Sequence, residues 1–196
     1  MRTRLPLLVL TAAFLLSPST SHATIFTFEA TLNGATEVPP NASPGTGFAT
    51  VTFDDVLNTM RVQVTFSDLL GLTTASHIHC CTAVPDAGNA GVATTTPTFT
   101  SFPTGVMAGT YDHTFDMTLA SSYNPAFVAL HGTVAGAEAF LLAGMLADES
   151  YLNIHSSFAP GGEIRGFLHE VPEPASLLLL GTGLSAAALR ARKRRG

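Results

Sequence analysis

The alternation of apolar and polar side chains from Met60 to Phe66 constrains the fold of this chain more than any other stretch. Every second residue in this run is apolar, and the three residues between them are polar. Successive side chains of a strand point to opposite faces, so a period of two predicts a strand with one buried face. A second run, Phe48–Phe53, precedes it, and turn residues at 54–58 predict a hairpin between the two.

Other segments extend this pattern along the chain and predict an all-β, antiparallel β-sandwich with one or two short helices. Asn124-Pro125 is a helix-start signal with Gly132 as its stop, and Ala135–Ala147 is rich in helix formers. Residues 82–105 predict a long connection that is either functional or mobile, with a short edge strand at Pro97–Phe102. The further strands are expected at Ile25–Leu32, Thr73–Cys81, Thr110–Leu119, Tyr151–His155 and Gly162–His169.

The first 23 residues have the features of a secretory signal peptide. Arg2 and Arg4 precede an apolar run from Leu5 to Leu16, and small residues follow before Ala23. This order of charge, apolar run and small residues is the one that signal peptidase reads. We expect cleavage after Ala23, so that the folded domain occupies residues 24–170.

Residues 171–196 have the features of a second targeting segment. Pro172-Glu173-Pro174 leads into an apolar run, Ala175–Leu189, and five of the six residues from Arg190 to Arg195 are basic. The run has 15 residues, or about 22 Å as a helix, against about 30 Å of hydrocarbon in a bilayer. This combination resembles the PEP-CTERM sorting signal of Gram-negative bacteria. The resemblance implies transient inner-membrane anchoring, recognition by an exosortase-type sorting enzyme, and release to the periplasm, outer surface or extracellular matrix. The alternative is a permanent C-terminal anchor.

Without its two ends the chain is strongly acidic. Residues 24–170 contain two basic and 13 acidic side chains, a net charge of −11, against −5 for the whole chain. Such a surface disfavours nucleic acid and anionic lipid as partners, and it suits cations or simple solubility. No nucleophile elbow, glycine-rich phosphate loop or paired-carboxylate arrangement stands out, which disfavours hydrolases and nucleotide-using enzymes.

The segment Ser76-His77-Ile78-His79-Cys80-Cys81 holds the residues best suited to bind a metal. On a strand, His77, His79 and Cys81 share one face, and two imidazoles at i and i+2 can converge on one ion. A copper or zinc site normally needs a third ligand, and His155 is the candidate. The alternative is that His77 and His79 form the polar face of a half-buried strand.

A polar cluster is expected near His155. If the last two predicted strands form a hairpin, Asn153 and His155 lie close to Glu163 and Arg165 on one face. The sequence leaves open whether this hairpin is a neighbour of the strand that carries His77 and His79.

The only two cysteines, Cys80 and Cys81, are adjacent in an exported chain. Three alternatives remain open for them: a disulfide between the two neighbours, a metal-ligating thiolate at Cys81, and an intermolecular bridge.

Four ordered motifs occur along the chain: Glu37-Val38-Pro39-Pro40, His77-Ile78-His79, Asn153-Ile154-His155 and Gly161-Gly162-Glu163-Ile164-Arg165-Gly166. Together they resemble the CHRD domain, a module named from chordin that also occurs in microbial secreted proteins. The resemblance covers about Thr24 to Glu170 and implies an immunoglobulin-like or superoxide-dismutase-like sandwich. The family usually has glycine after His-Ile-His, where this chain has Cys80-Cys81. The resemblance implies no settled activity, because a fold does not determine function.

Two functions are consistent with these features. The first, which the sequence favours, is a non-enzymatic interaction or extracellular-matrix module, with exopolysaccharide or matrix proteins as partners. The second is a copper- or zinc-binding or redox protein that uses His77, His79 and His155, with Cys81 as a further candidate. Enzymatic activity is left open.

Overall fold

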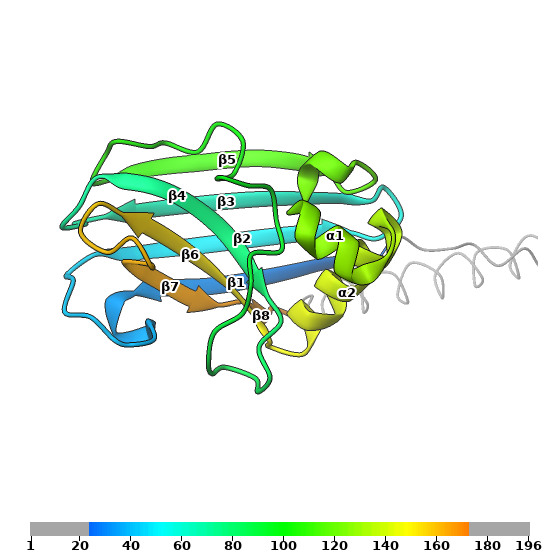
Figure 1. The fold of residues 1–196 in the computed structure, drawn as a ribbon, viewed down its shortest axis with the longest axis horizontal. Coiled ribbons are helices and arrows are strands. Elements are labelled where there is room, and N and C mark those ends of the chain that lie inside the picture. Colours follow the sequence, from blue (N-terminus) through cyan, green and yellow to red (C-terminus); the bar gives the residue numbers. More distant parts are fainter. Residues whose placement is uncertain (1–23, 173–196) are drawn as a thin grey trace, which may run out of the picture.

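Eight strands and two α-helices form the part of the chain that the computed structural model describes, residues 24–172. The predicted all-β class with two short helices is confirmed (Figure 1). The expected signal peptide and the apolar run after Pro172 lie outside the described residues. The strands are β1 (Ile25–Asn33), β2 (Thr46–Asp54), β3 (Thr59–Ser67), β4 (Thr73–Cys80), β5 (Gly109–Asp116), β6 (Ser150–Ser156), β7 (Ile164–Phe167) and β8 (His169–Glu170). The helices are α1 (Pro125–His131) and α2 (Val134–Leu146), and the 3-10 turns are η1 (Gly34–Thr36) and η2 (Ala120–Ser122).

The strands form one antiparallel sheet in the order β4-β6-β7-β1-β2-β3-β5, with β8 paired to β1. β7 joins β1 through a single residue pair, Asn33 with Arg165. The sheet curls there like half of a barrel, so β4 and β6 face β2 and β3 across the core (Figure 1). The layers of the expected sandwich are therefore two parts of one curled sheet.

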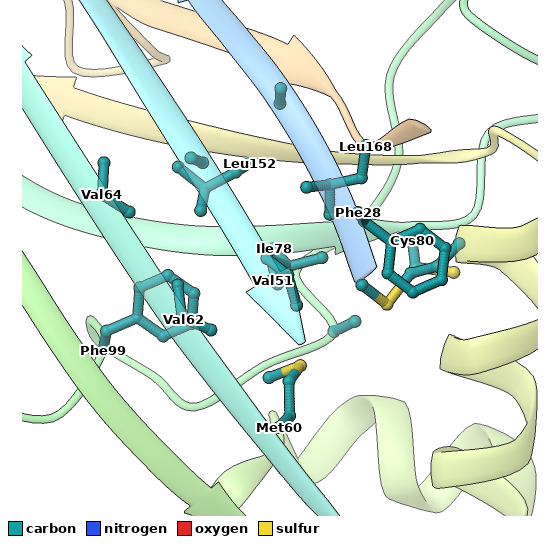
Figure 2. Close-up of a cluster of buried hydrophobic side chains, with 14 of the residues drawn as sticks. Phe28, Val51, Met60, Val62, Val64, Ile78, Cys80, Phe99, Leu152 and Leu168 are labelled. Carbon is teal, nitrogen blue, oxygen red and sulfur yellow. The ribbon is translucent and has the colours of Figure 1, made fainter. Parts of the chain in front are cut away.

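The core consists of the apolar residues that the period-two pattern selects. Val51 pairs with Val62 across β2 and β3, and both side chains are fully buried. Ile78 of β4 and Leu152 of β6 pack against them from the opposite part of the sheet (Figure 2). Each such side chain stabilises the fold by about 1.5–3 kcal/mol when fully buried.

The two helices lie at one end of the sheet (Figure 1). Asn124 caps α1 through a hydrogen bond from the Ala126 amide, and Pro125 occupies the first turn, where its missing N–H costs nothing. α1 ends at His131 and is followed by Gly132, whose φ of +79° favours glycine. Thr133 then caps α2 through the Gly136 amide. The predicted start and stop signals thus act as expected.

The long connection from residue 82 to 105 contains no strand, so the predicted edge strand at Pro97–Phe102 is wrong. The connection instead runs along the free edge of β4, which pairs on its other side with β6. The Phe99 amide donates to the Ser76 carbonyl and the Ala93 amide to the Ile78 carbonyl. These irregular bonds satisfy an edge that would otherwise be open to other chains.

Candidate metal centre

Three histidines lie on the face of β4 and β6 that points away from the core. In the register of these strands His77 pairs with Asn153, His79 with Tyr151, and Ala75 with His155. Strand residues two apart share a face, so all three imidazoles project to the same side. The antiparallel pairing of β4 with β6 is the adjacency that the sequence left open.

The three rings converge. The ring centroids are 5.3 Å apart for His77 and His155, 5.8 Å for His77 and His79, and 5.9 Å for His79 and His155. Each ring offers one nitrogen that lies within 4.8 Å of the nitrogens offered by the other two. His77 and His79 are buried and His155 is half-buried.

Each ring is held by one hydrogen bond to a backbone carbonyl. The bonds join His77 Nε2 to Pro97 at 2.7 Å, His79 Nδ1 to Ala90 at 2.9 Å and His155 Nδ1 to Pro160 at 2.9 Å. A carbonyl oxygen only accepts, so each of these nitrogens carries the proton of a neutral ring and the other nitrogen carries a lone pair. The lone-pair nitrogens are His77 Nδ1, His79 Nε2 and His155 Nε2, and all three are buried without a hydrogen-bond partner.

The surroundings keep the three rings neutral. The pKa of His79 is lowered to about 4, mainly by burial and also by the neighbouring His155, His77 and Arg165, against the raising effect of the bond to Ala90. Burial also lowers the pKa of His77 and of His155 below the usual value. A neutral imidazole is the form that binds metal, so the cluster is ready to ligate at neutral pH.

Tyr151 and Arg165 pack beside the histidines. The Tyr151 ring stacks on His79, with centroids 4.8 Å apart and planes 5° apart. The Ala90 amide donates to the Tyr151 hydroxyl at 3.2 Å, so this side chain also fixes the backbone that holds His79. The Arg165 guanidinium lies 4.6 Å from the Tyr151 ring centroid, within the range of a cation–π interaction.

Arg165 anchors two loops beneath the cluster. It is 1% exposed, and it donates to the Thr36 carbonyl at 2.6 Å and to Asn89 Oδ1 at 2.8 Å. Glu37 lies 3.8 Å away. Burial raises the pKa of Glu37 to about 7, against the opposing effects of Arg165 and of the Asn153 amide.

Glu163, which the sequence placed with Arg165, makes a different set of bonds. It accepts hydrogen bonds from Ser43 Oγ at 2.6 Å, from the Gly71 amide at 3.2 Å, and also from Ser156 and Leu70. Burial alone would raise the pKa of this carboxyl, but these bonds lower it. The expected polar cluster is therefore divided: Asn153 and Arg165 lie beside the histidines, whereas the Glu163 carboxylate binds loop atoms and Ser156 at the C-terminal end of β6.

Of the three alternatives for the cysteines, the structure has the disulfide between Cys80 and Cys81. Cys81 is thereby outside the histidine group, and its sulfur lies near the carbonyl of Phe140 on α2. Gly144 of α2 packs directly on this disulfide, since a Cβ there would meet the Cys81 sulfur.

Sequence reasoning missed the groups that hold the histidines in place. The carbonyls of Ala90, Pro97 and Pro160 come from loops whose paths have no periodic signal. The sequence shows Glu37 only as part of a family motif, with no indication of its approach to Arg165. Tyr151 lies in an expected strand, but its stacking on His79 depends on strand pairing.

A second group of possible ligands lies on the surface. Asp86, Asp148 and His169 also offer atoms within 4.8 Å of one another. His169 Nδ1 lies 3.2 Å from Asp148 and His169 Nε2 lies 3.5 Å from Asp86, so both ring nitrogens already face a carboxylate. The exposed side chains of this group satisfy one another.

The fold and the site define an all-β domain with three histidines held beneath its longest loop. The chain belongs to the CHRD domain family, whose model matches residues 28–168. The PEP-CTERM protein-sorting motif matches residues 170–195, which implies export, a C-terminal membrane-anchored sorting signal and recognition by an exosortase. Both expected resemblances are confirmed. Comparison with curated proteins and with solved structures found no significant match.

Proposed function

We propose that this exosortase-targeted surface protein binds one transition-metal ion through His77, His79 and His155. The observation that carries the proposal is the state of the three lone-pair nitrogens. Each is buried without a partner, on a ring whose other nitrogen donates to a carbonyl. Buried polar atoms almost always have a hydrogen-bond partner, so three unpartnered nitrogens in one place need an explanation.

The fit to a metal is supported by the carbonyl bonds and by the spacing. Metal-ligating histidines usually donate their second ring N–H to a carbonyl or carboxylate, which fixes the ring and the tautomer. Three nitrogens around a tetrahedral ion, each about 2.0–2.1 Å from it, lie about 3.4 Å apart. The cluster, with nitrogens within 4.8 Å of one another, needs only small ring movements to reach this arrangement.

Copper and zinc are the candidate ions. Imidazole nitrogen suits zinc, copper, iron and nickel, whereas magnesium and calcium prefer oxygen ligands. The net charge of −11 over residues 24–170 attracts cations to the domain. A bound ion would give the three nitrogens the partner that they lack within the described structure.

The test is the metal content of protein purified without a histidine tag. We expect about one equivalent of copper or zinc in the wild type and little in His79→Ala. A metal that prefers the folded state stabilises it by mass action, so copper or zinc should raise the melting temperature of the wild type only. Equal shifts in both proteins would indicate adventitious binding to the acidic surface and contradict the proposal.

A role as a non-enzymatic matrix module is the second candidate, and one surface feature favours it. The outer face of β2, β3 and β5 has an open groove of about 390 Å³. The groove is lined by hydroxyl, amide and carboxylate groups beside the exposed ring of Phe48, a mixture that suits the hydroxyls and apolar faces of a polysaccharide. The lining includes Phe48, Thr50, Gln63, Thr65, Thr110 and Asp112.

Affinity electrophoresis in gels that contain the extracellular polysaccharide of the producing cells tests this second role. The wild type should be retarded and Phe48→Ala should migrate freely. Wild-type migration that is unchanged by the polysaccharide would contradict the matrix role without affecting the metal site.

A further inference from the structure

Both ends of the described chain leave the domain at the end where the two helices lie (Figure 1). Thr24 bonds to the β2–β3 turn, with its amide donating to Asp55 Oδ1 at 3.0 Å. The Val171 amide donates to the Thr27 carbonyl at 2.7 Å, close to the start of β1. We call this the terminal end: the β2–β3 turn, η2, α1, α2 and the residues next to Thr24 and Val171.

The connection from the terminal end to the apolar run is very short. β8 ends at Glu170 and the apolar run begins at Ala175. Five Cα–Cα steps span at most about 18 Å, and Pro172 and Pro174 restrict the backbone further. With the run in the membrane as a sorting anchor, the terminal end is held within this distance of the lipid.

The most exposed large side chains at the terminal end are apolar. Leu130 of α1 is 77% exposed, and Leu57 at the tip of the β2–β3 turn is 68% exposed. From Pro125 to Leu146 the only charged side chain is Glu138. No single helix in residues 24–172 is long and apolar enough to cross a membrane. α1 and α2 meet both criteria only when they are taken together, as a pair bent by 94°. Other exposed apolar residues here are Ile25, Val56, Leu119, Phe140, Leu146 and Val171.

We propose that the terminal end rests on the lipid surface while the sorting segment is attached, with Leu57 and Leu130 in the headgroup region. Apolar side chains at a membrane-facing surface enter the boundary between headgroups and acyl chains, and the tether supplies the proximity. The carboxylates of Asp55, Asp148 and Glu170 lie at the same end and repel anionic lipid. The favoured surface is therefore zwitterionic phospholipid. This contact does not depend on the metal site.

The chain contains no tryptophan, so a single introduced tryptophan reports its own position. Leu57→Trp and Leu130→Trp place the probe at the terminal end. Phe158→Trp is the matched control, because Phe158 is 51% exposed on the loop after β6, at the opposite end of the sheet (Figure 1). Leu178→Trp, inside the apolar run, reports insertion of the anchor.

The experiment uses chains that retain residues 171–196, reconstituted in vesicles of phosphatidylcholine with and without brominated acyl chains. Bromine should reduce the emission of Leu57→Trp and Leu130→Trp at least twofold, that of Leu178→Trp by more, and that of Phe158→Trp by less than a tenth. Unchanged emission at Leu57→Trp and Leu130→Trp, or equal quenching at Phe158→Trp, would overturn the proposal. Absence of quenching at Leu178→Trp would remove the anchor that the proposal requires and would overturn it as well.

Discussion

Two groups of three side chains in this domain bring potential ligand atoms within 4.8 Å of one another, and their surroundings differ. His77, His79 and His155 lie beneath loops, and each has one nitrogen without a partner. Asp86, Asp148 and His169 are on the surface and pair with one another. Convergence alone is therefore a weak sign of a metal site. Convergence of buried atoms that have no other partner is a much stronger one.

The largest effect is expected on metal affinity. His155→Ala removes one of three proposed ligands and should weaken zinc or copper binding on the order of 1,000-fold, or about 4 kcal/mol. His169→Ala should change it by less than about threefold, because that ring already faces two carboxylates. Isothermal titration of both variants checks the difference. A greater loss in His169→Ala would place the metal at the surface group.

The next largest effect is expected on stability, from the loss of Arg165, which binds two loops beside the three histidines. Arg165→Ala removes two hydrogen bonds to loop atoms and leaves Glu37 buried without its cation, so we expect a cost on the order of 3 kcal/mol in unfolding free energy. Arg61 is the natural control. Its pair with Asp112 is half-exposed, so Arg61→Ala should cost much less than Arg165→Ala. Equal costs in urea unfolding would contradict the supporting role of Arg165.

A somewhat smaller effect is expected from acid, which should lower the stability of the metal-free domain through the buried histidine group. The folded pKa of His79 is about 4, below its usual 6.5, so the unfolded chain takes up a proton that the folded chain does not as pH falls between these values. Stability of the metal-free domain therefore decreases over that window, on the order of 2–3 kcal/mol from this residue. In His79→Asn the decrease should be smaller than in the wild type. Urea unfolding at pH 6.5, 5.5 and 4.5 measures the two slopes, and equal slopes would contradict the low pKa of His79.

The smallest effect on stability is expected in the surface group of Asp86, Asp148 and His169. Asp148→Asn removes one exposed partner of His169, and exposed ion pairs contribute little. We expect a change of less than about 0.5 kcal/mol, and a still smaller one in 0.5 M salt because salt screens surface charges. A cost above about 1.5 kcal/mol would show that this group stabilises the fold and would contradict the contrast with the buried histidines.

Much of the fold could be predicted because period-two alternation depends on local sequence. β1, β2 and β3 begin and end within two residues of the expected positions, and the helix caps at Asn124 and Gly132 act as their chemistry predicts. The expected edge strand at Pro97–Phe102 failed because Phe99 and Phe102 enter the core through an irregular loop.

The site could be predicted only in part. The spacing of His77 and His79 placed both rings on one face, but the approach of His155 required β6 to pair with β4. Strand order depends on tertiary packing, which no local pattern encodes. The same holds for the carbonyls of Ala90 and Pro97, and for Glu163, whose partners at Ser43 and Gly71 are far away in sequence.

In the proposed metal centre, the three buried nitrogens hold one metal ion. The most direct measurement is an anomalous difference map from crystals of the mature domain grown with one equivalent of zinc and recorded at the zinc absorption edge. We predict a single strong peak about 2.0–2.1 Å from His77 Nδ1, His79 Nε2 and His155 Nε2. A peak beside Asp86, Asp148 and His169 with none among the three buried histidines, or no peak at either group, would contradict the account.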